Sequence, residues 1–282
     1  MKDESFVSTV DGTKIFVRSW RPSGTPRALV VISHGFKAYG GLYTWTAEQL
    51  AKAGFVVYAH DHRGHGESGG DRYEATDIQH FVTDLDHVVD LAKSRDPGLQ
   101  TFLLGHSAGG VIGCVYALEH QEKLAGFVCE SYAFGVYVPA LGLQALKGLS
   151  HVAPHLHVVD VKNKLFSRDP KVVAALDHDP LIPQINYPAG TVAAMVRGTE
   201  RIRAEFAKIT LPVLIVHGSE DKVTEPAGSK LFFESTGAKD KTLKIYDGYY
   251  HDLLADEGRE VPLADIQAWF EARISVAPVV SA

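Results

Sequence analysis

Runs of β-branched and other apolar residues recur along the chain and alternate with stretches of helical periodicity. The runs Ala28–Ser33 (ALVVIS) and Phe55–Ala59 (FVVYA) are almost wholly apolar, which is typical of strands buried on both faces of a sheet. In residues 77–94 the apolar positions instead recur with a period close to 3.6, which predicts a helix. Strands that alternate with helices predict the α/β class, with a mostly parallel sheet and helices on both faces.

The sequence predicts eight strands, the first two of which form a hairpin around Asp11-Gly12. Helices are expected at residues 46–53, 77–94 and 265–274, and directly after residue 110. The predicted strands are Phe6–Val10, Lys14–Trp20, Ala28–Ser33, Phe55–Ala59, Thr101–Leu104, Phe127–Cys129, Val213–Val216 and Leu243–Tyr246.

Residues 131–206 interrupt this pattern, because they contain no clear buried strand. They are too many for a simple crossover and read as helices and loops. We therefore predict a helical cap subdomain at 131–206, inserted over the carboxyl edge of the strands. The α/β core would consist of residues 1–130 and 207–275, with a flexible tail at 276–282.

Composition excludes several classes of protein. A chain of 282 residues with 45% hydrophobic residues can bury a large core, and a formal net charge of -6 gives no electrostatic reason to bind nucleic acid. Cys114 and Cys129 lie in apolar stretches, which favours free thiols in a reducing compartment. Residues 1–9 have no apolar core of a signal peptide, and we expect a cytoplasmic protein without stable membrane insertion.

The pentapeptide Gly105-His106-Ser107-Ala108-Gly109 fits the pattern G-x-S-x-G. It follows a predicted strand and precedes a predicted helix, the context of a nucleophile elbow. In that turn the serine projects from the edge of the sheet, and the helix N-terminus points its free N–H groups toward a developing oxyanion. Ser107 is the predicted nucleophile.

A serine nucleophile needs a base and a carboxylate that orients the base. Asp221 and His251 each lie shortly after a predicted strand, in the order Ser, Asp, His that this elbow accompanies. Glu220 is the alternative acid, although a solvated loop charge suits it better. For His217 we expect a structural role, and for Asp252 a position facing solvent or capping the last helical region.

The predicted oxyanion hole consists of two backbone N–H groups. One belongs to Ala108, the residue after the nucleophile, and the other to Phe36, just after the strand Ala28–Ser33. Donors at these positions would bind the oxygen of a tetrahedral intermediate.

Together these segments resemble the monoacylglycerol lipase and lysophospholipase branch of the α/β-hydrolases, over residues 6–275. The resemblance implies an α/β-hydrolase fold, a helical cap, acylglycerol or lysophospholipid substrates, and no cofactor. The segments that carry it are His34-Gly35, Asp61–Ser68 (DHRGHGES), Gly105–Gly109, Ser167–Pro170 (SRDP), Asp179–Ile182 (DPLI), Gly218–Asp221 (GSED) and His251–Leu254 (HDLL).

One segment departs from the family pattern. The family commonly reads H-G-x-G-E-H after the oxyanion strand, whereas here residues 37–41 read KAYGG. The Phe36 backbone can still form the hole, but the element that recognises a polar glycerol is missing. A broader range of esters is therefore expected.

Two further groups of residues have more than one interpretation. Phe134 and Tyr137 are predicted either to line an acyl pocket or to pack the cap on the core. The histidines at 60, 62 and 65 resemble a metal cluster, but the chain there leaves a strand into a glycine-rich turn, so no metal site is expected.

The sequence predicts a serine hydrolase of carboxylic esters, acting on a small molecule as a monomer or homodimer, with at most transient membrane contact through the cap. Other capped hydrolases of this fold are aminopeptidases, carbon–carbon hydrolases or perhydrolases, and some act as ligand receptors. An aminopeptidase needs an acidic group for the substrate amine, and Asp160, Asp169 and Glu200 are candidates.

Overall fold

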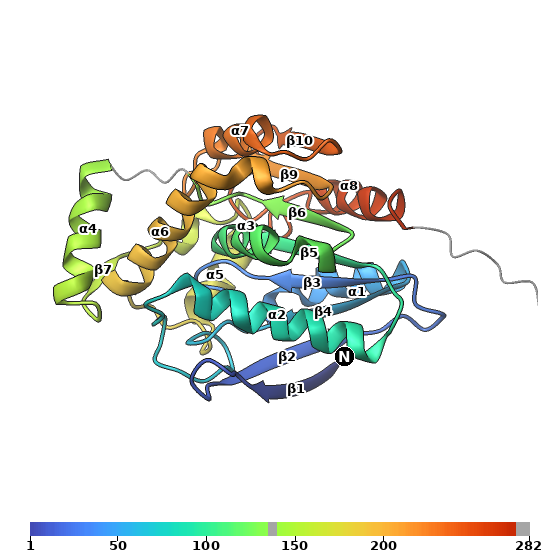
Figure 1. The fold of residues 1–282 in the computed structure, drawn as a ribbon, viewed down its shortest axis with the longest axis horizontal. Coiled ribbons are helices and arrows are strands. Elements are labelled where there is room, and N and C mark those ends of the chain that lie inside the picture. Colours follow the sequence, from blue (N-terminus) through green and yellow to red (C-terminus); the bar gives the residue numbers. More distant parts are fainter. Residues whose placement is uncertain (135–139, 275–282) are drawn as a thin grey trace, which may run out of the picture.

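A computed structural model describes residues 1–134 and 140–274 (Figure 1). Its main element is an eight-stranded sheet with the strand order β1-β2-β4-β3-β5-β6-β9-β10, and two short strands, β7 and β8, pair separately. The strands are β1 (Lys2–Val7), β2 (Lys14–Trp20), β3 (Ala28–Ser33), β4 (Phe55–His60), β5 (Thr101–His106), β6 (Gly126–Glu130), β7 (His157–Val159), β8 (Tyr187–Pro188), β9 (Val213–Gly218) and β10 (Lys241–Tyr246).

The six strands from β4 to β10 in the sheet are parallel, and β2 runs antiparallel to both β1 and β4. This mostly parallel sheet is the predicted architecture, and it is the α/β-hydrolase fold. The first strand was predicted at Phe6–Val10, which is wrong, because it ends at Val7 and the turn begins earlier. The hairpin itself forms, with Val7 opposite Lys14.

Helices cover both faces of the sheet, as β3 illustrates. Leu29 and Val31 belong to the core cluster on one face, while Val30 and Ile32 belong to the cluster on the other. Residues of α2, α3 and α7 line the first cluster, and residues of α1 and α8 line the second. These helices are α1 (Thr44–Lys52), α2 (Ile78–Arg95), α3 (Ala108–His120), α7 (Pro226–Ser235) and α8 (Glu260–Glu271).

Local sequence signals explain most helix boundaries. The Asp77 carboxylate accepts a hydrogen bond from the Gln79 N–H and caps α2, one residue inside the predicted start. The sequence analysis missed α7, although Pro226 at its first position is a common helix start. Its Phe232 is fully buried against the sheet.

Residues 131–206, called the insertion below, connect β6 to β9. Its described elements are α4 (Ala140–Val152), β7, α5 (Pro170–His178), β8 and α6 (Ala189–Glu205). The short β7–β8 pair was not predicted. In Figure 1, α4 and α6 lie beyond one end of the sheet. Among the described residues, no helix is long and apolar enough to cross a membrane.

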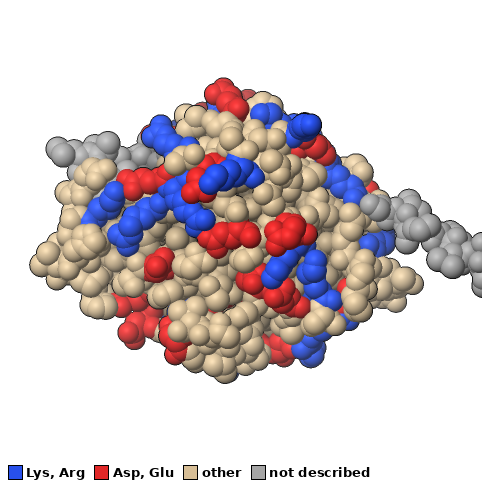
Figure 2. Space-filling view, viewed as in Figure 1, with Lys and Arg blue, Asp and Glu red and all other residues tan. Residues whose placement is uncertain are grey.

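Charged side chains of both signs are mixed on the face of the molecule shown in Figure 2. Several of them pair directly, such as Lys123 with Asp86 at 2.6 Å. Red groups lie beside the blue ones on this face, so the basic side chains there have acidic neighbours.

Candidate active site

Ser107 lies in a strained turn between β5 and α3. Its backbone has φ 55° and ψ -115°, an unusual conformation for a residue with a side chain. The turn requires small neighbours: a Cβ atom at Gly109 would lie 2.0 Å from the Ser33 carbonyl oxygen, and one at Gly105 would lie 2.5 Å from the Gly109 oxygen. Strand and helix can approach this closely only with glycine at both positions.

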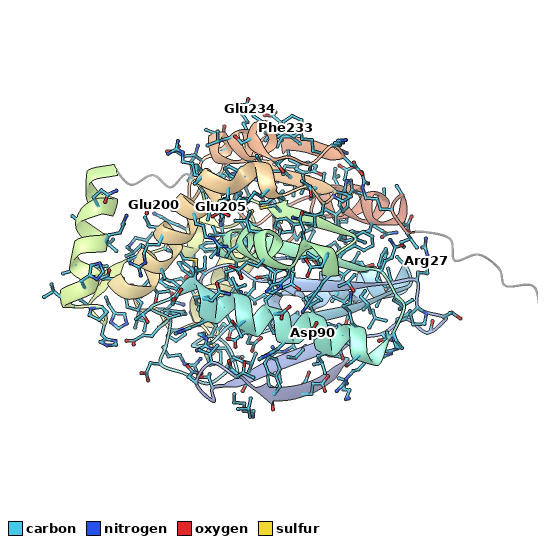
Figure 3. All side chains as sticks on the ribbon, viewed as in Figure 1. Arg27, Asp90, Glu200, Glu205, Phe233 and Glu234 are labelled. Carbon is cyan, nitrogen blue, oxygen red and sulfur yellow. The ribbon has the colours of Figure 1, made fainter. Side chains whose placement is uncertain are left out.

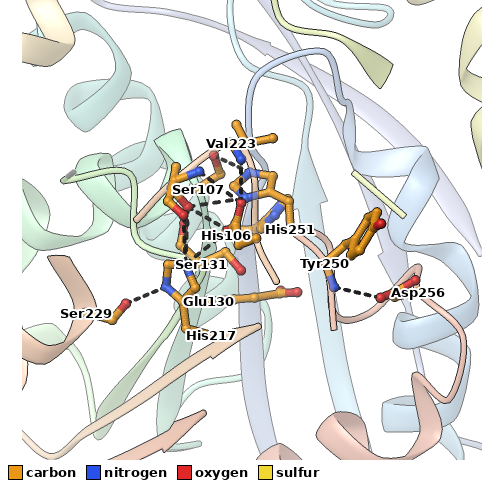
Figure 4. Close-up of polar contacts among 12 residues, drawn as sticks. His106, Ser107, Glu130, Ser131, His217, Val223, Ser229, Tyr250, His251 and Asp256 are labelled. Carbon is orange, nitrogen blue, oxygen red and sulfur yellow. Dashed lines mark hydrogen bonds and ion pairs between the residues drawn. The ribbon is translucent and has the colours of Figure 1, made fainter. Parts of the chain in front are cut away.

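The three predicted catalytic side chains form one hydrogen-bonded chain (Figure 4). Nε2 of His251 lies 2.9 Å from Oγ of Ser107, and Nδ1 of His251 lies 2.7 Å from Oδ2 of Asp221. All three residues are buried. The structure therefore brings together residues that lie far apart in the sequence, in the geometry of a nucleophile, a base and an orienting acid.

The Asp221 carboxylate is held by several donors. The backbone N–H groups of Val223 and Thr224 donate to its Oδ1 at 2.7 and 2.9 Å, and the Thr224 hydroxyl donates to Oδ2 at 2.8 Å. Burial alone would raise the pKa of Asp221, but the neighbouring His251 and the hydrogen bond from His217 lower it well below its usual value. Glu220, the alternative acid, is half exposed and pairs with Lys222.

His217 contacts the same carboxylate oxygen as His251. Its Nε2 lies 3.0 Å from Oδ2 of Asp221, and its Nδ1 lies 2.7 Å from the Ser229 hydroxyl. The sequence analysis gave this histidine only a structural role. Its position at the end of β9, four residues before the acid, was the signal that could have identified it as a partner of Asp221.

The predicted oxyanion donors lie on either side of the nucleophile. Phe36 follows β3 and Ala108 begins α3, and both line the same cavity as Ser107. Since β3 and β5 are neighbours in the sheet, the loops after them meet at its carboxyl edge. Gly35 lies so close to the elbow that a Cβ atom there would be 3.0 Å from Cβ of Ser107.

Ser107 opens on a cavity of about 280 Å³. Its walls are mainly apolar and come from the core (Phe36, Val111) and from the insertion (Phe134, Met195). Phe134 also packs against the main buried cluster, which contains residues of the sheet and of α3, so it both lines the cavity and joins the insertion to the core. Tyr137 lies outside the described residues.

Comparison with known proteins identifies the family. Residues 24–258 match the family described as serine aminopeptidase, S33. The chain belongs to this family. It is 33% identical to a monoacylglycerol lipase of Mycolicibacterium smegmatis over 97% of this chain and 98% of that protein. It is also 34% identical to the monoglyceride lipase of Homo sapiens, over 99% of this chain and 94% of the relative.

A solved structure agrees with these relatives. The monoacylglycerol lipase of Paleococcus ferrophilus superposes with a TM-score of 0.83 and 30% identity, over 92% of this chain and 99% of that one. The fold of this S33-family protein is thus the α/β-hydrolase fold that the resemblance implied.

Within this S33-family protein, the SRDP segment connects the insertion to the base. Phe166, just before it, is buried, lines the cavity and packs edge-on against the His251 ring, with 5.2 Å between centroids. The Asp252 N–H donates to the Phe166 carbonyl at 2.8 Å, and the Arg168 guanidinium binds Asp256 at 2.8 Å. The SRDP motif was part of the resemblance, but Phe166 was not predicted to contribute to the site.

A second buried polar group lies behind the catalytic histidine. His106, Glu130 and Asp252 each offer a ligand atom, and these atoms lie within 4.8 Å of one another. One polar atom on each has no hydrogen-bond partner among the described residues. Asp252 is partly exposed, but its Oδ1 is buried in this group, a contact that the prediction of a solvent-facing or helix-capping residue did not include.

The spacing of this group would accommodate a cation, but its protonation opposes one. Burial raises the pKa of Glu130 well above its usual value and raises the pKa of Asp252 to about 6. Metal ligands must be deprotonated, so the raised pKa of Glu130 disfavours this residue as a ligand. The Glu130 carboxylate group also accepts the Leu254 N–H at 3.2 Å and so connects β6 to the loop that carries the base.

The histidines near the DHRGHGES motif bind one another. Nε2 of His60 lies 3.1 Å from Nδ1 of His62, and Nε2 of His62 lies 3.0 Å from the His34 carbonyl oxygen. Burial lowers the pKa of His60 to about 3, so its ring is neutral at physiological pH. Asp61 binds the Arg18 guanidinium at 2.5 Å. The motif thus forms a support of hydrogen bonds and ion pairs beside the loop after β3.

Proposed function

We propose that this protein hydrolyses carboxylic esters of small molecules through an acyl-enzyme at Ser107. The observation that supports this most directly is the Ser107–His251–Asp221 chain opening on an apolar cavity. The printed names of the relatives, monoacylglycerol lipase and monoglyceride lipase, point to the same chemistry.

In the proposed reaction, Ser107 Oγ attacks the ester carbonyl while His251 Nε2 accepts its proton. Asp221 holds the imidazole in the required tautomer and stabilises its protonated form. The carbonyl oxygen becomes an oxyanion, which the N–H groups of Phe36 and Ala108 stabilise. His251 then protonates the leaving alcohol, and in the second half it activates the water that releases the acid and restores Ser107.

The cavity suits an acyl chain. Its walls beside Ser107 are apolar, and each methylene buried there would contribute about 0.8 kcal/mol, close to a fourfold gain if it is realised in the transition state. The alcohol half has no counterpart of the glycerol-binding G-E-H element, because Lys37, Ala38 and Tyr39 occupy those positions. We therefore expect simple alkyl or aryl esters to be accepted beside monoacylglycerols.

We further propose that the insertion is a cap subdomain on a core of residues 1–130 and 207–275. Its support is the position of α4 and α6 beyond one end of the sheet and the share of the cavity wall that the insertion supplies. The oligomeric state, monomer or homodimer, and transient membrane contact through the cap stay predictions. The tail 276–282 lies outside the described residues.

The family description raises aminopeptidase activity as a second candidate. Of the three acids that could bind a substrate amine, only Asp160 lines the cavity, and two lysines already pair with it. Asp169 caps α5, and Glu200, labelled on α6 in Figure 3, pairs with a lysine of α4 at 2.8 Å. Among the described residues that line the cavity, the acid is Asp160, and it already has cationic partners, which favours the ester.

The test is the hydrolysis rate of the purified protein on p-nitrophenyl esters of increasing acyl length, on monoacylglycerols, and on aminoacyl p-nitroanilides. We expect ester hydrolysis that improves with chain length and then levels off, and negligible amide hydrolysis. Faster cleavage of the aminoacyl amides would replace the esterase with the peptidase. A single turnover followed by lasting covalent occupancy would favour a receptor.

A further inference from the structure

Tyr187 of β8 lies fully buried above the loop that carries the proposed oxyanion donor. Its ring stacks on Phe36, with 4.0 Å between centroids and 18° between planes. On its other side it stacks on Tyr73, at 4.3 Å and 17°. Although it belongs to the insertion, Tyr187 is therefore packed between two residues of the core.

The Tyr187 hydroxyl makes two hydrogen bonds inside the core. It lies 2.5 Å from the Lys37 backbone nitrogen and 3.2 Å from Nε2 of His65. Burial lowers the pKa of His65 to about 4, so the ring is neutral at physiological pH. Since its Nδ1–H donates to the Arg63 carbonyl at 2.9 Å, its Nε2 is an acceptor. Tyr187 therefore donates to His65 and accepts the N–H of Lys37.

This arrangement fixes a strained segment of backbone. Lys37 has φ 50°, a left-handed conformation that costs a residue with a side chain on the order of 1 kcal/mol. The bond to Tyr187 holds the peptide unit between Phe36 and Lys37, while the ring stacking holds the Phe36 side chain. With both held, the direction of the neighbouring Phe36 N–H is determined.

We propose that Tyr187 is a positioning residue for the oxyanion hole, and that His65 of the DHRGHGES motif orients its hydroxyl. The inference rests on the proposed function, because it assigns Phe36 as an oxyanion donor. It also couples the insertion to the reaction. A displacement of β8 would move the ring and the hydroxyl of Tyr187, and through these contacts the Phe36 N–H. A donor must lie within hydrogen-bond distance of the oxyanion, so small displacements reduce the rate.

The test compares Tyr187→Phe with Tyr73→Phe. Both remove a buried hydroxyl from the same stack, but the Tyr73 hydroxyl donates to the Pro183 carbonyl at 2.9 Å, away from the oxyanion loop. Removing a whole oxyanion donor costs about 10²–10³ in rate, so we expect a misplaced donor to cost roughly tenfold in kcat. KM should stay within about twofold, and Tyr73→Phe should keep the wild-type kcat.

A second readout is the inhibition constant of an alkyl trifluoromethyl ketone, whose adduct with Ser107 carries an oxyanion. This constant should rise about tenfold in Tyr187→Phe and should stay unchanged in Tyr73→Phe. Rates are taken per active site, titrated with a phosphonate. Should Tyr187→Phe not fold, His65→Ala removes the acceptor instead and should lower kcat about threefold. Equal kcat and equal inhibition in the variants and the wild type would overturn the inference. A wild type without esterase activity would overturn the proposed function instead.

Discussion

The core and the insertion contribute to the same cavity in different ways. In the core, the proposed catalytic atoms lie in loops after β3, β5, β9 and β10, and several hydrogen bonds fix each loop. The insertion has a small buried cluster of its own, formed by Phe166, Leu176 and Ile182. It contributes mainly apolar wall and rests on the core through side chains such as Tyr187 and Phe134.

The difference reflects what each task requires. Proton transfer and oxyanion stabilisation depend on atoms held within a fraction of an ångström, so the core supplies strands and hydrogen-bonded loops for the catalytic side chains. Enclosing an acyl chain needs shape and apolar surface, which many packings provide. Substitutions in the core loops should therefore change the rate of the chemical step. Substitutions in the part of the insertion that forms the cavity wall should change the choice of substrate, whereas Tyr187, which packs on the oxyanion loop, belongs with the core residues in this respect.

The largest effect is expected for Ser107→Ala. Losing the nucleophile should lower kcat for esters by on the order of 10⁵ or more, because the residual site can only orient substrate and stabilise the oxyanion. Thermal unfolding should stay close to that of the wild type, and a fluorophosphonate should label the wild type at this serine only. Near wild-type turnover by the folded variant would remove Ser107 from the mechanism.

Next in size is Asp221→Asn, with an expected loss of about 10⁴ in kcat, because the imidazole would favour the wrong tautomer. Glu220→Gln is the matched control, since Glu220 is the adjacent carboxylate and is half exposed. It should change kcat by less than about twofold. Steady-state kinetics on a single ester measure the loss of kcat in each variant. A larger loss in Glu220→Gln than in Asp221→Asn would assign the role of the acid to Glu220.

A smaller effect, on stability and not on rate, is expected at Asp252, a residue of the core that takes no part in the proposed reaction. Burial raises the pKa of Asp252 from 3.8 to about 6, so its favourable contribution is complete below pH 3.8 and is lost as the pH rises through 6. The side chain in Asp252→Asn cannot ionise, so this variant does not lose stability as the pH rises through 6. Relative to the wild type, its free energy of unfolding should rise by on the order of 2 kcal/mol between pH 4 and pH 7.5.

Urea unfolding of both proteins at the two pH values measures this difference. The other titratable groups are the same in both proteins, so their contributions cancel. Glu220→Gln again serves as the control, because it also replaces a carboxylate by an amide, at a side chain that is half exposed. A pH-independent difference between Asp252→Asn and the wild type would mean that folding leaves the pKa of Asp252 unchanged.

The smallest effect is expected in the insertion. Phe134→Ala enlarges the cavity and should shift the best acyl chain of an ester series to a longer one, with changes of about three- to tenfold in kcat/KM. Val152→Ala, at a residue of the insertion that is 86% exposed, should leave the profile unchanged. If Phe134→Ala lowered kcat equally for every chain length, the division between core and insertion would be wrong.

The sequence predicted the sheet well because its strands carry a local signal. Runs such as those of β3 and β4 are almost wholly apolar and are buried throughout, and a strand forms at each of the eight predicted places in the sheet. The elbow was also predictable, since glycine spacing around Ser107 and its strand and helix are local properties. Where the signal was weak, predictions failed: the first strand ends earlier than expected, and α7 and the β7–β8 pair were missed.

The sequence by itself determined which residue types stand at the carboxyl ends of the strands, and with them the candidates Ser107, Asp221 and His251. Only the tertiary structure decided their neighbours. His217 on the Asp221 carboxylate, Phe166 against the base and Tyr187 above Phe36 depend on contacts between segments distant in the chain. Periodicity and spacing describe neighbours along the chain, whereas burial and hydrogen bonding across the fold are set when the strands and the insertion pack together.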